Sequence, residues 1–120
     1  MEIDAQDAFD INFFENALKR SPSDLQILEL LGGLYSKYDM ARQALRIDRR
    51  LVRRLPNDSR IRYNLACSLC LMGRETDALE TLKQAFDLGY DDLEWLREDP
   101  DLEGIRDRPE FQELIEGSLP

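Results

Sequence analysis

Cys67 and Cys70 have the C-x-x-C spacing found in zinc sites and thiol redox sites. A structural zinc ion takes about four nitrogen or sulfur ligands. The chain contains no histidine and no other cysteine that could complete such a set. A redox pair usually sits at a helix N-terminus, whereas these two cysteines lie in the middle of a predicted helix. We therefore expect both thiols to be reduced and free of metal.

The absence of histidine also removes the most common general base and excludes Ser-His-Asp and Cys-His arrangements within this chain. Carboxylate pairs occur at Asp91 with Asp92 and at Asp99 with Asp101, but at predicted turn and cap positions. The pair Gly32-Gly33 lies inside a predicted helix and lacks the spacing of a phosphate-binding loop. We expect no catalytic residue, no cofactor and no enzymatic activity.

Basic residues cluster in the middle of the chain. Residues 40–63 hold eight basic and two acidic residues, a net charge of about +6, whereas residues 91–120 hold three and eleven, about −8. Steps of three and four residues place five arginines on one face of a predicted helix. The arginine stripe consists of Arg42, Arg46, Arg49, Arg50 and Arg53. It is either a solvated convex face or a contact for an anionic ligand, a nucleic acid or an acidic protein surface.

The bulk composition narrows the classes of partner. The net charge of −9 argues against nucleic-acid binding by the molecule as a whole. The first ten residues contain no lysine or arginine, so they lack the basic region of a signal peptide. No apolar run approaches the roughly 20 residues that span a bilayer. We expect a soluble cytoplasmic protein with no membrane contact.

The cysteines and arginines described above must be positioned by a helical repeat with a period of 34 residues. Asp24, Asp58 and Asp92 open successive units, and Leu31 recurs as Leu65. Small residues recur too, with Gly32 matched by Ala66 and Ala44 by Ala78. Apolar residues at steps of three and four predict helices over about 24–38, 41–54, 58–72 and 75–88. A period of about 34 with fixed small residues is typical of stacked helix-turn-helix units, so we expect an all-α solenoid.

The first unit has the pattern Leu31-Gly32-x-x-Tyr35, followed by Ala44 and Pro56. The second unit has Leu65-Ala66-x-x-Leu69, followed by Gly73, Ala78, Leu82, Ala85 and Phe86. Both patterns resemble the signature of the tetratricopeptide repeat family. Two full units cover about 24–92. The tail from Trp95 to Phe111 is similar to the closing segment that often follows the last repeat in small bacterial members. The resemblance implies a scaffold for protein–protein interaction, such as an adaptor or co-chaperone, rather than a chemical centre.

We expect residues 1–120 to form one domain. Its parts are a partial repeat or N-terminal helix at about 5–22, repeat one at 24–57, repeat two at 58–91 and a C-terminal cap at 92–120. Phe9 and Phe13 are expected to cover the apolar face at one end of the array, and Trp95 with Phe111 the other. We expect Ser23 and Asp58 to cap the first helices of the two repeats.

In the family that the chain resembles, the first helix of each repeat lines a concave groove that binds partners. Mapped by spacing, the groove carries Gln26, Glu29, Gly33, Ser36, Lys37, Arg60, Tyr63, Asn64, Cys67, Cys70 and Leu71. We expect a peptide or helix of a partner protein there. Members that grip a terminal carboxylate use lysine and asparagine in the first repeat. Those positions hold Glu29 and Gly33 here, so we do not expect that class of ligand.

Asp48 departs from the family pattern, because repeat one carries a carboxylate where repeat two has Leu82. A carboxylate at a contact between repeats needs a partner. Either Asp48 pairs with Arg62 of the next helix, or the helix rotates so that Asp48 reaches solvent.

The charge pattern also allows two copies of the chain to associate, with the arginine stripe of one copy against the acidic tail of the other. The sequence is thus compatible with a monomer, with weak self-association, or with a structural self-assembling subunit.

Overall fold

The computed structural model describes residues 2–118, and within that range the chain forms helices and no β-strand. The helices in chain order are α1 (Ala5–Arg20), α2 (Leu25–Lys37), α3 (Ala41–Arg54), α4 (Ser59–Leu71), α5 (Glu75–Asp87), α6 (Leu93–Glu98), the 3-10 helix η1 (Pro100–Ile105) and α7 (Pro109–Gly117). The first residue of the chain and the last two residues of the predicted cap lie outside the described residues.

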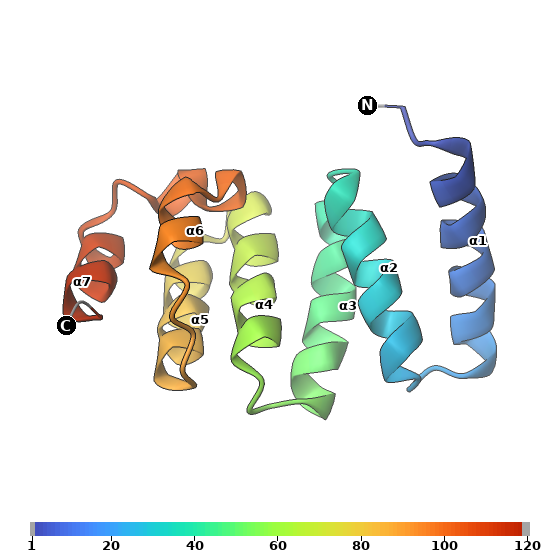
Figure 1. Cartoon of the computed structure of the whole chain (residues 1–120), viewed down its shortest axis with the longest axis horizontal. Helices are drawn as coiled ribbons and strands as arrows, with labels where there is room; N and C mark the ends of the chain where they lie inside the picture. The colour runs from blue at the N-terminus through green and yellow to red at the C-terminus, as the bar shows by residue number, and fades with distance from the viewer. Residues whose placement is uncertain (1, 119–120) are drawn as a thin grey trace.

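Consecutive helices pack side by side in antiparallel pairs, with α1 at one end of the array and α7 at the other (Figure 1). The array measures 44 × 31 × 22 Å, so it is elongated. The prediction of an all-α helix-turn-helix solenoid with an N-terminal helix and C-terminal capping helices is confirmed. No helix between residues 2 and 118 combines the length and apolar character that crossing a bilayer requires.

Aspartate caps repeat along the chain with the period of 34. The carboxylates of Asp24, Asp58 and Asp92 each accept the backbone N–H three residues later, at 3.1, 3.2 and 3.1 Å. Each bond satisfies a donor that the first turn of a helix leaves unpaired. Asp58 therefore caps α4 as predicted. The prediction for Ser23 is wrong, because Asp24, one residue later, occupies the cap position of α2.

The turn between the two helices of each repeat also recurs. Gly73 has a φ of 76°, in the left-handed region that glycine enters at little cost, and Asp39 has a φ of 57° at the same position of repeat one. The following amides donate to equivalent carbonyls, Met40 to Tyr35 at 2.8 Å and Arg74 to Leu69 at 2.9 Å. Both repeats thus end their first helix in the same way, although only one uses glycine.

Small residues let α2 and α3 approach each other closely. A Cβ added to Gly32 would lie 3.2 Å from Cγ2 of Ile47, so the two helices contact each other through the bare backbone. A Cβ added to the neighbouring Gly33 would meet nothing within 4 Å, because that residue faces the solvent side of the same helix. Two adjacent glycines therefore have different roles, one in packing and the other in keeping a surface open.

This difference gives a test of the α2–α3 contact. We expect Gly33→Ala to raise the free energy of unfolding by about 0.5–1 kcal/mol, because alanine restricts the unfolded chain and meets no neighbour. Gly32→Ala should be less stable than Gly33→Ala by about 1 kcal/mol or more, since Ile47 must move to accept the new methyl group. Urea denaturation of the two variants measures the difference. Equal stabilities would contradict the close contact.

Some of the aromatic residues that we predicted at the two ends of the array do not cover them. Phe9 and Phe13 are 62% and 56% exposed, because α1 turns Ile11, Phe14 and Leu18 toward α2 instead. Trp95 is 47% exposed, so its predicted role in the cap is wrong as well. The other end is closed as expected by buried side chains of the C-terminal segment, namely Leu96, Leu102, Ile105, Phe111 and Ile115.

Candidate functional site

The C-terminal segment covers three of the eleven predicted groove residues. Tyr63, Cys67 and Cys70 on α4 are 3%, 8% and 7% exposed. Helix η1 packs against α4 (Figure 1), and a Cβ added to Gly104 would lie 3.3 Å from the sulfur of Cys70. The prediction that these three side chains form an open binding face is therefore wrong. The tail occupies the surface that a ligand would otherwise contact.

Asp99 holds this segment in place. Its Oδ2 accepts the Tyr63 hydroxyl at 2.6 Å and the Cys67 thiol at 3.6 Å, and its Oδ1 accepts the backbone N–H of Asp101 at 2.9 Å. Burial raises the pKa of the Tyr63 hydroxyl, and burial together with the Asp99 charge raises the pKa of the Cys67 thiol. Both groups therefore stay protonated at neutral pH and act as donors to the carboxylate.

Cys67, Asp99 and Asp101 bring one potential metal-ligating atom each within 4.8 Å of one another. Both oxygens of Asp99 already accept hydrogen bonds from protein groups, and the Cys67 thiol is one of these donors. Hydrogen bonding within the protein accounts for the cluster, and we assign no metal to it. The cysteines are both buried, free thiols.

Seven of the eleven predicted groove residues line a cavity of about 250 Å³ between α2, α3 and α4. Helix α2 contributes Gly32 and Gly33, α3 contributes Asp48, and α4 contributes Asn64 and Ser68. The predicted groove residues that line it are Glu29, Gly33, Ser36, Arg60, Asn64, Cys67 and Leu71. Gln26 is exposed but lies outside this lining. We call this space the α2–α4 cavity.

Asp48 lies on the floor of the α2–α4 cavity and is 5% exposed. Its Oδ2 accepts the hydroxyl of Ser68 at 2.6 Å. The predicted pair with Arg62 does not form, because Arg62 donates to the carbonyl of Pro56 at 2.7 Å and to Oε1 of Gln84 at 3.1 Å. The alternative of a solvent-exposed Asp48 is wrong too.

The antiparallel course of α3 and α4 explains this outcome. Asp48 is in the middle of α3, opposite the C-terminal half of α4, where Ser68 lies. Arg62 lies six residues earlier on α4, about 9 Å along the helix axis. Spacing within each helix left two faces open for Asp48, and it carried no information about the register of one helix on the next.

The charges around the cavity are mostly negative. Four carboxylates line it, from Glu29, Asp39, Asp48 and Asp101, against one guanidinium, from Arg60. Arg60 and Glu29 pair at 2.8 Å across the opening, and both side chains are well exposed. Burial raises the pKa of Asp48 to about 6, an effect that the hydrogen bond from Ser68 only partly opposes. Burial, followed by the nearby charges of Asp99 and Asp39, also raises the pKa of Asp101.

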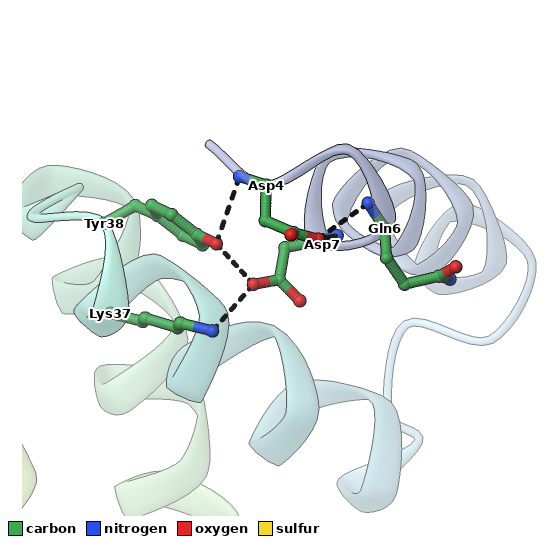
Figure 2. Close-up of polar contacts among 5 residues, drawn as sticks. All are labelled: Asp4, Gln6, Asp7, Lys37 and Tyr38. Atoms are coloured by element: carbon green, nitrogen blue, oxygen red, sulfur yellow. Dashed lines mark hydrogen bonds and ion pairs between the residues drawn. The ribbon is translucent and has the colours of Figure 1, made fainter. Parts of the chain in front are cut away.

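Lys37, another predicted groove residue, is engaged elsewhere. Its ammonium lies 2.8 Å from Oδ2 of Asp7 on α1, and the Tyr38 hydroxyl donates to the same carboxylate (Figure 2). The hydrogen bonds from Lys37 and Tyr38 lower the pKa of Asp7. Lys37 and Tyr38 therefore fasten α1 to the end of α2 and do not line the cavity.

The arginine stripe is exposed along α3 at four of its five positions, Arg42, Arg46, Arg49 and Arg53. Among residues 2–118, none of these four lies within ion-pair distance of a carboxylate. Arg50 is partly buried and donates to the backbone carbonyl of Pro22, so it joins α3 to the loop between α1 and α2. Four of the five arginines of the stripe are thus exposed charges without an ion-pair partner among the described residues.

Comparison with known proteins gives one partial likeness. No model of a known protein family matches the chain. A stretch of 53 residues, 44% of this chain, is 36% identical to a chloroplastic protein of Arabidopsis thaliana. The matched stretch is 16% of the length of that plant protein. The likeness therefore covers less than half of this chain and a small part of the relative.

Proposed function

We propose that this protein is a small tetratricopeptide-like interaction module that binds a peptide or helix of a partner protein in the α2–α4 cavity. The observation that carries the proposal is an open cavity of about 250 Å³ at the face where successive first helices converge. The 34-residue recurrence of caps, turns and small residues supports the tetratricopeptide assignment. An adaptor or co-chaperone role fits this surface, and the proposal contains no catalytic step.

The proposed site is narrower than the groove predicted from the sequence. Tyr63, Cys67 and Cys70 on α4 are covered by the C-terminal segment, so contacts with a partner come from the α2 side, the exposed residues of α4 and the floor on α3. Asn64 and Leu71 are exposed on α4 and line the cavity, and Leu71, which is 44% exposed, offers a partner an apolar contact there.

Gly33 provides a direct test of the cavity. Gly33 lines the cavity, and a Cβ added there meets no atom within 4 Å, so a leucine at this position would extend into the cavity. We expect Gly33→Leu to reduce capture of the partner protein from the native cell about tenfold or more, because the side chain occupies the binding volume. Quantitative mass spectrometry of captured proteins measures this. Gly33→Ala is the matched control, since it changes the helix backbone in the same way without filling the cavity.

A second candidate function rests on the four exposed arginines of the stripe. An anionic ligand, a nucleic acid or an acidic protein surface would bind the convex face of α3 and be released by salt. The same capture experiment with Arg49→Glu combined with Arg53→Glu separates the candidates. Loss of the partner with this variant, and its retention with Gly33→Leu, would favour the arginine stripe and contradict the cavity.

A further inference from the structure

Asp48 is a buried carboxylate that no cation neutralises. It is 5% exposed, and among residues 2–118 no lysine or arginine nitrogen lies within ion-pair distance of it. Its Oδ2 is engaged by Ser68, whereas Oδ1 receives no hydrogen bond from the described residues. Oδ1 lies next to Gly32 of α2, where an added Cβ would be 3.9 Å away, an ordinary van der Waals distance. A buried charge without a partner lowers the stability of the folded protein, so a cationic ligand that neutralises Asp48 would be favoured.

The surroundings of Asp48 add to its negative potential. Glu29, Asp39 and Asp101 line the same cavity, and the single guanidinium there, on Arg60, already pairs with Glu29. Clefts lined by one sign of charge concentrate ligands of the opposite sign. Asp48 does not belong to any described group of three potential metal ligands with atoms within 4.8 Å of one another. The cavity therefore offers one deep carboxylate to a cationic group, and not the ligand set of a metal ion.

We propose that the α2–α4 cavity receives the lysine side chain of a partner segment, whose ammonium pairs with Oδ1 of Asp48. This inference rests on the proposed function and specifies the chemistry of the partner. At about 250 Å³ the cavity is below the roughly 300–1,000 Å³ of small-molecule sites, which suits a single side chain.

Lysine fits better than arginine because one oxygen of Asp48 is already occupied. A guanidinium binds best when both oxygens of a carboxylate accept its parallel N–H groups. Ser68 holds Oδ2 at 2.6 Å, so one oxygen remains for a ligand. An ammonium is a compact charge with three donors, so it can pair with a single carboxylate oxygen without the parallel geometry that a guanidinium requires.

The test uses pentapeptides of alanine with capped ends and a central lysine, arginine, acetyl-lysine or norleucine. We expect the lysine peptide to shift the amide NMR signals of Gly33 and Ser68 and to bind about tenfold or more tightly than the norleucine peptide. That ratio reflects a charge-assisted hydrogen bond in a buried site. Asp48→Asn should bring the lysine peptide to the affinity of norleucine. Asp87→Asn makes the same chemical change at an exposed position on α5, outside the cavity lining, and should leave binding unchanged.

Binding should also depend on pH. Burial raises the pKa of Asp48 to about 6, so the group is largely protonated at pH 5 and ionised at pH 7.5. We expect the lysine peptide to bind about tenfold more weakly at pH 5, and this dependence to disappear in Asp48→Asn. The titratable groups that share the cavity are Glu29, Asp39, Cys67 and Asp101. Any pH dependence of lysine-peptide binding that remains in Asp48→Asn is the contribution of these four groups.

Two results would overturn this inference without affecting the proposed function. One is equal binding of the norleucine and lysine peptides with shifts at Gly33 and Ser68. The other is full lysine binding by Asp48→Asn. Tighter binding of arginine than of lysine would overturn the choice of lysine. Shifts confined to the exposed arginines of α3 would contradict both the inference and the cavity as the binding site, as would the absence of binding by every peptide.

Discussion

Phe111→Ala is expected to lower the free energy of unfolding by about 3–5 kcal/mol, the range for truncating a large buried aromatic side chain. Phe111 on α7 is 1% exposed and packs in a cluster that joins α4, α5, η1 and α7. Its loss would leave a cavity between the last repeat and the segment that closes it. Domains of this size are stable by about 5–15 kcal/mol, so this loss is a large fraction of the total stability. Urea denaturation followed by circular dichroism measures the change.

Phe9→Ala is the matched control, since it makes the same substitution on α1, where the side chain is 62% exposed. We expect less than about 1 kcal/mol from it. A similar small effect at Phe111 would mean that the C-terminal segment is not an integral part of the core. Tyr63, Cys67 and Cys70 would then be available to a ligand, as the sequence had predicted.

Asp48→Asn is expected to stabilise the protein at neutral pH by about 2–3 kcal/mol. Burial raises the pKa of this carboxyl from 3.8 to about 6. The folded state therefore binds a proton more tightly than the unfolded state does. The stability that this proton provides is present below about pH 4 and is lost as the pH rises to about 6, at about 1.4 kcal/mol per pH unit. Asparagine keeps an acceptor for Ser68 and carries no charge at any pH.

The measurement is the free energy of unfolding of both proteins at pH 4, 5, 6 and 7.5. We expect similar values at pH 4 and a growing advantage for Asp48→Asn above it. Asp87→Asn should follow the wild type throughout. A wild type that is more stable than Asp48→Asn at pH 7.5 would show that the Asp48 charge has a compensating partner within the protein, and would remove the basis for lysine binding.

The charge of Asp48 in the α2–α4 cavity is thus expected to reduce the stability of the free protein. A carboxylate is held where Leu82 is found in the second repeat, with one hydroxyl as its partner. If a lysine neutralises it in the complex, binding the partner also stabilises the fold, because a ligand that binds only the folded state shifts the unfolding equilibrium. The site is then a deviation from the repeat pattern that has a function.

The pattern at single positions predicted the site only in part. The carboxylate at Asp48 was evident from the sequence, because it interrupts an apolar position of the repeat. Its partner Ser68 was missed, since small polar residues are common on helices and give no signal by themselves. Asp39 could have been found from the period alone, because it lies 34 residues before Gly73 and shares its left-handed backbone. Asp101 had no local signal that placed it beside α2 and α3.

The sequence by itself determined the helices of the two repeats, the cap at Asp58 and the all-α repeat. These features depend on contacts within a few residues, and a period of 34 shows them twice. Only the tertiary structure decided that η1 packs against α4, that the buried Tyr63 donates to Asp99, and that Asp48 faces Ser68 and not Arg62. Helical periodicity specifies which face of a helix is apolar, but many elements can cover an apolar face. The choice depends on side-chain packing between segments 20 to 36 residues apart.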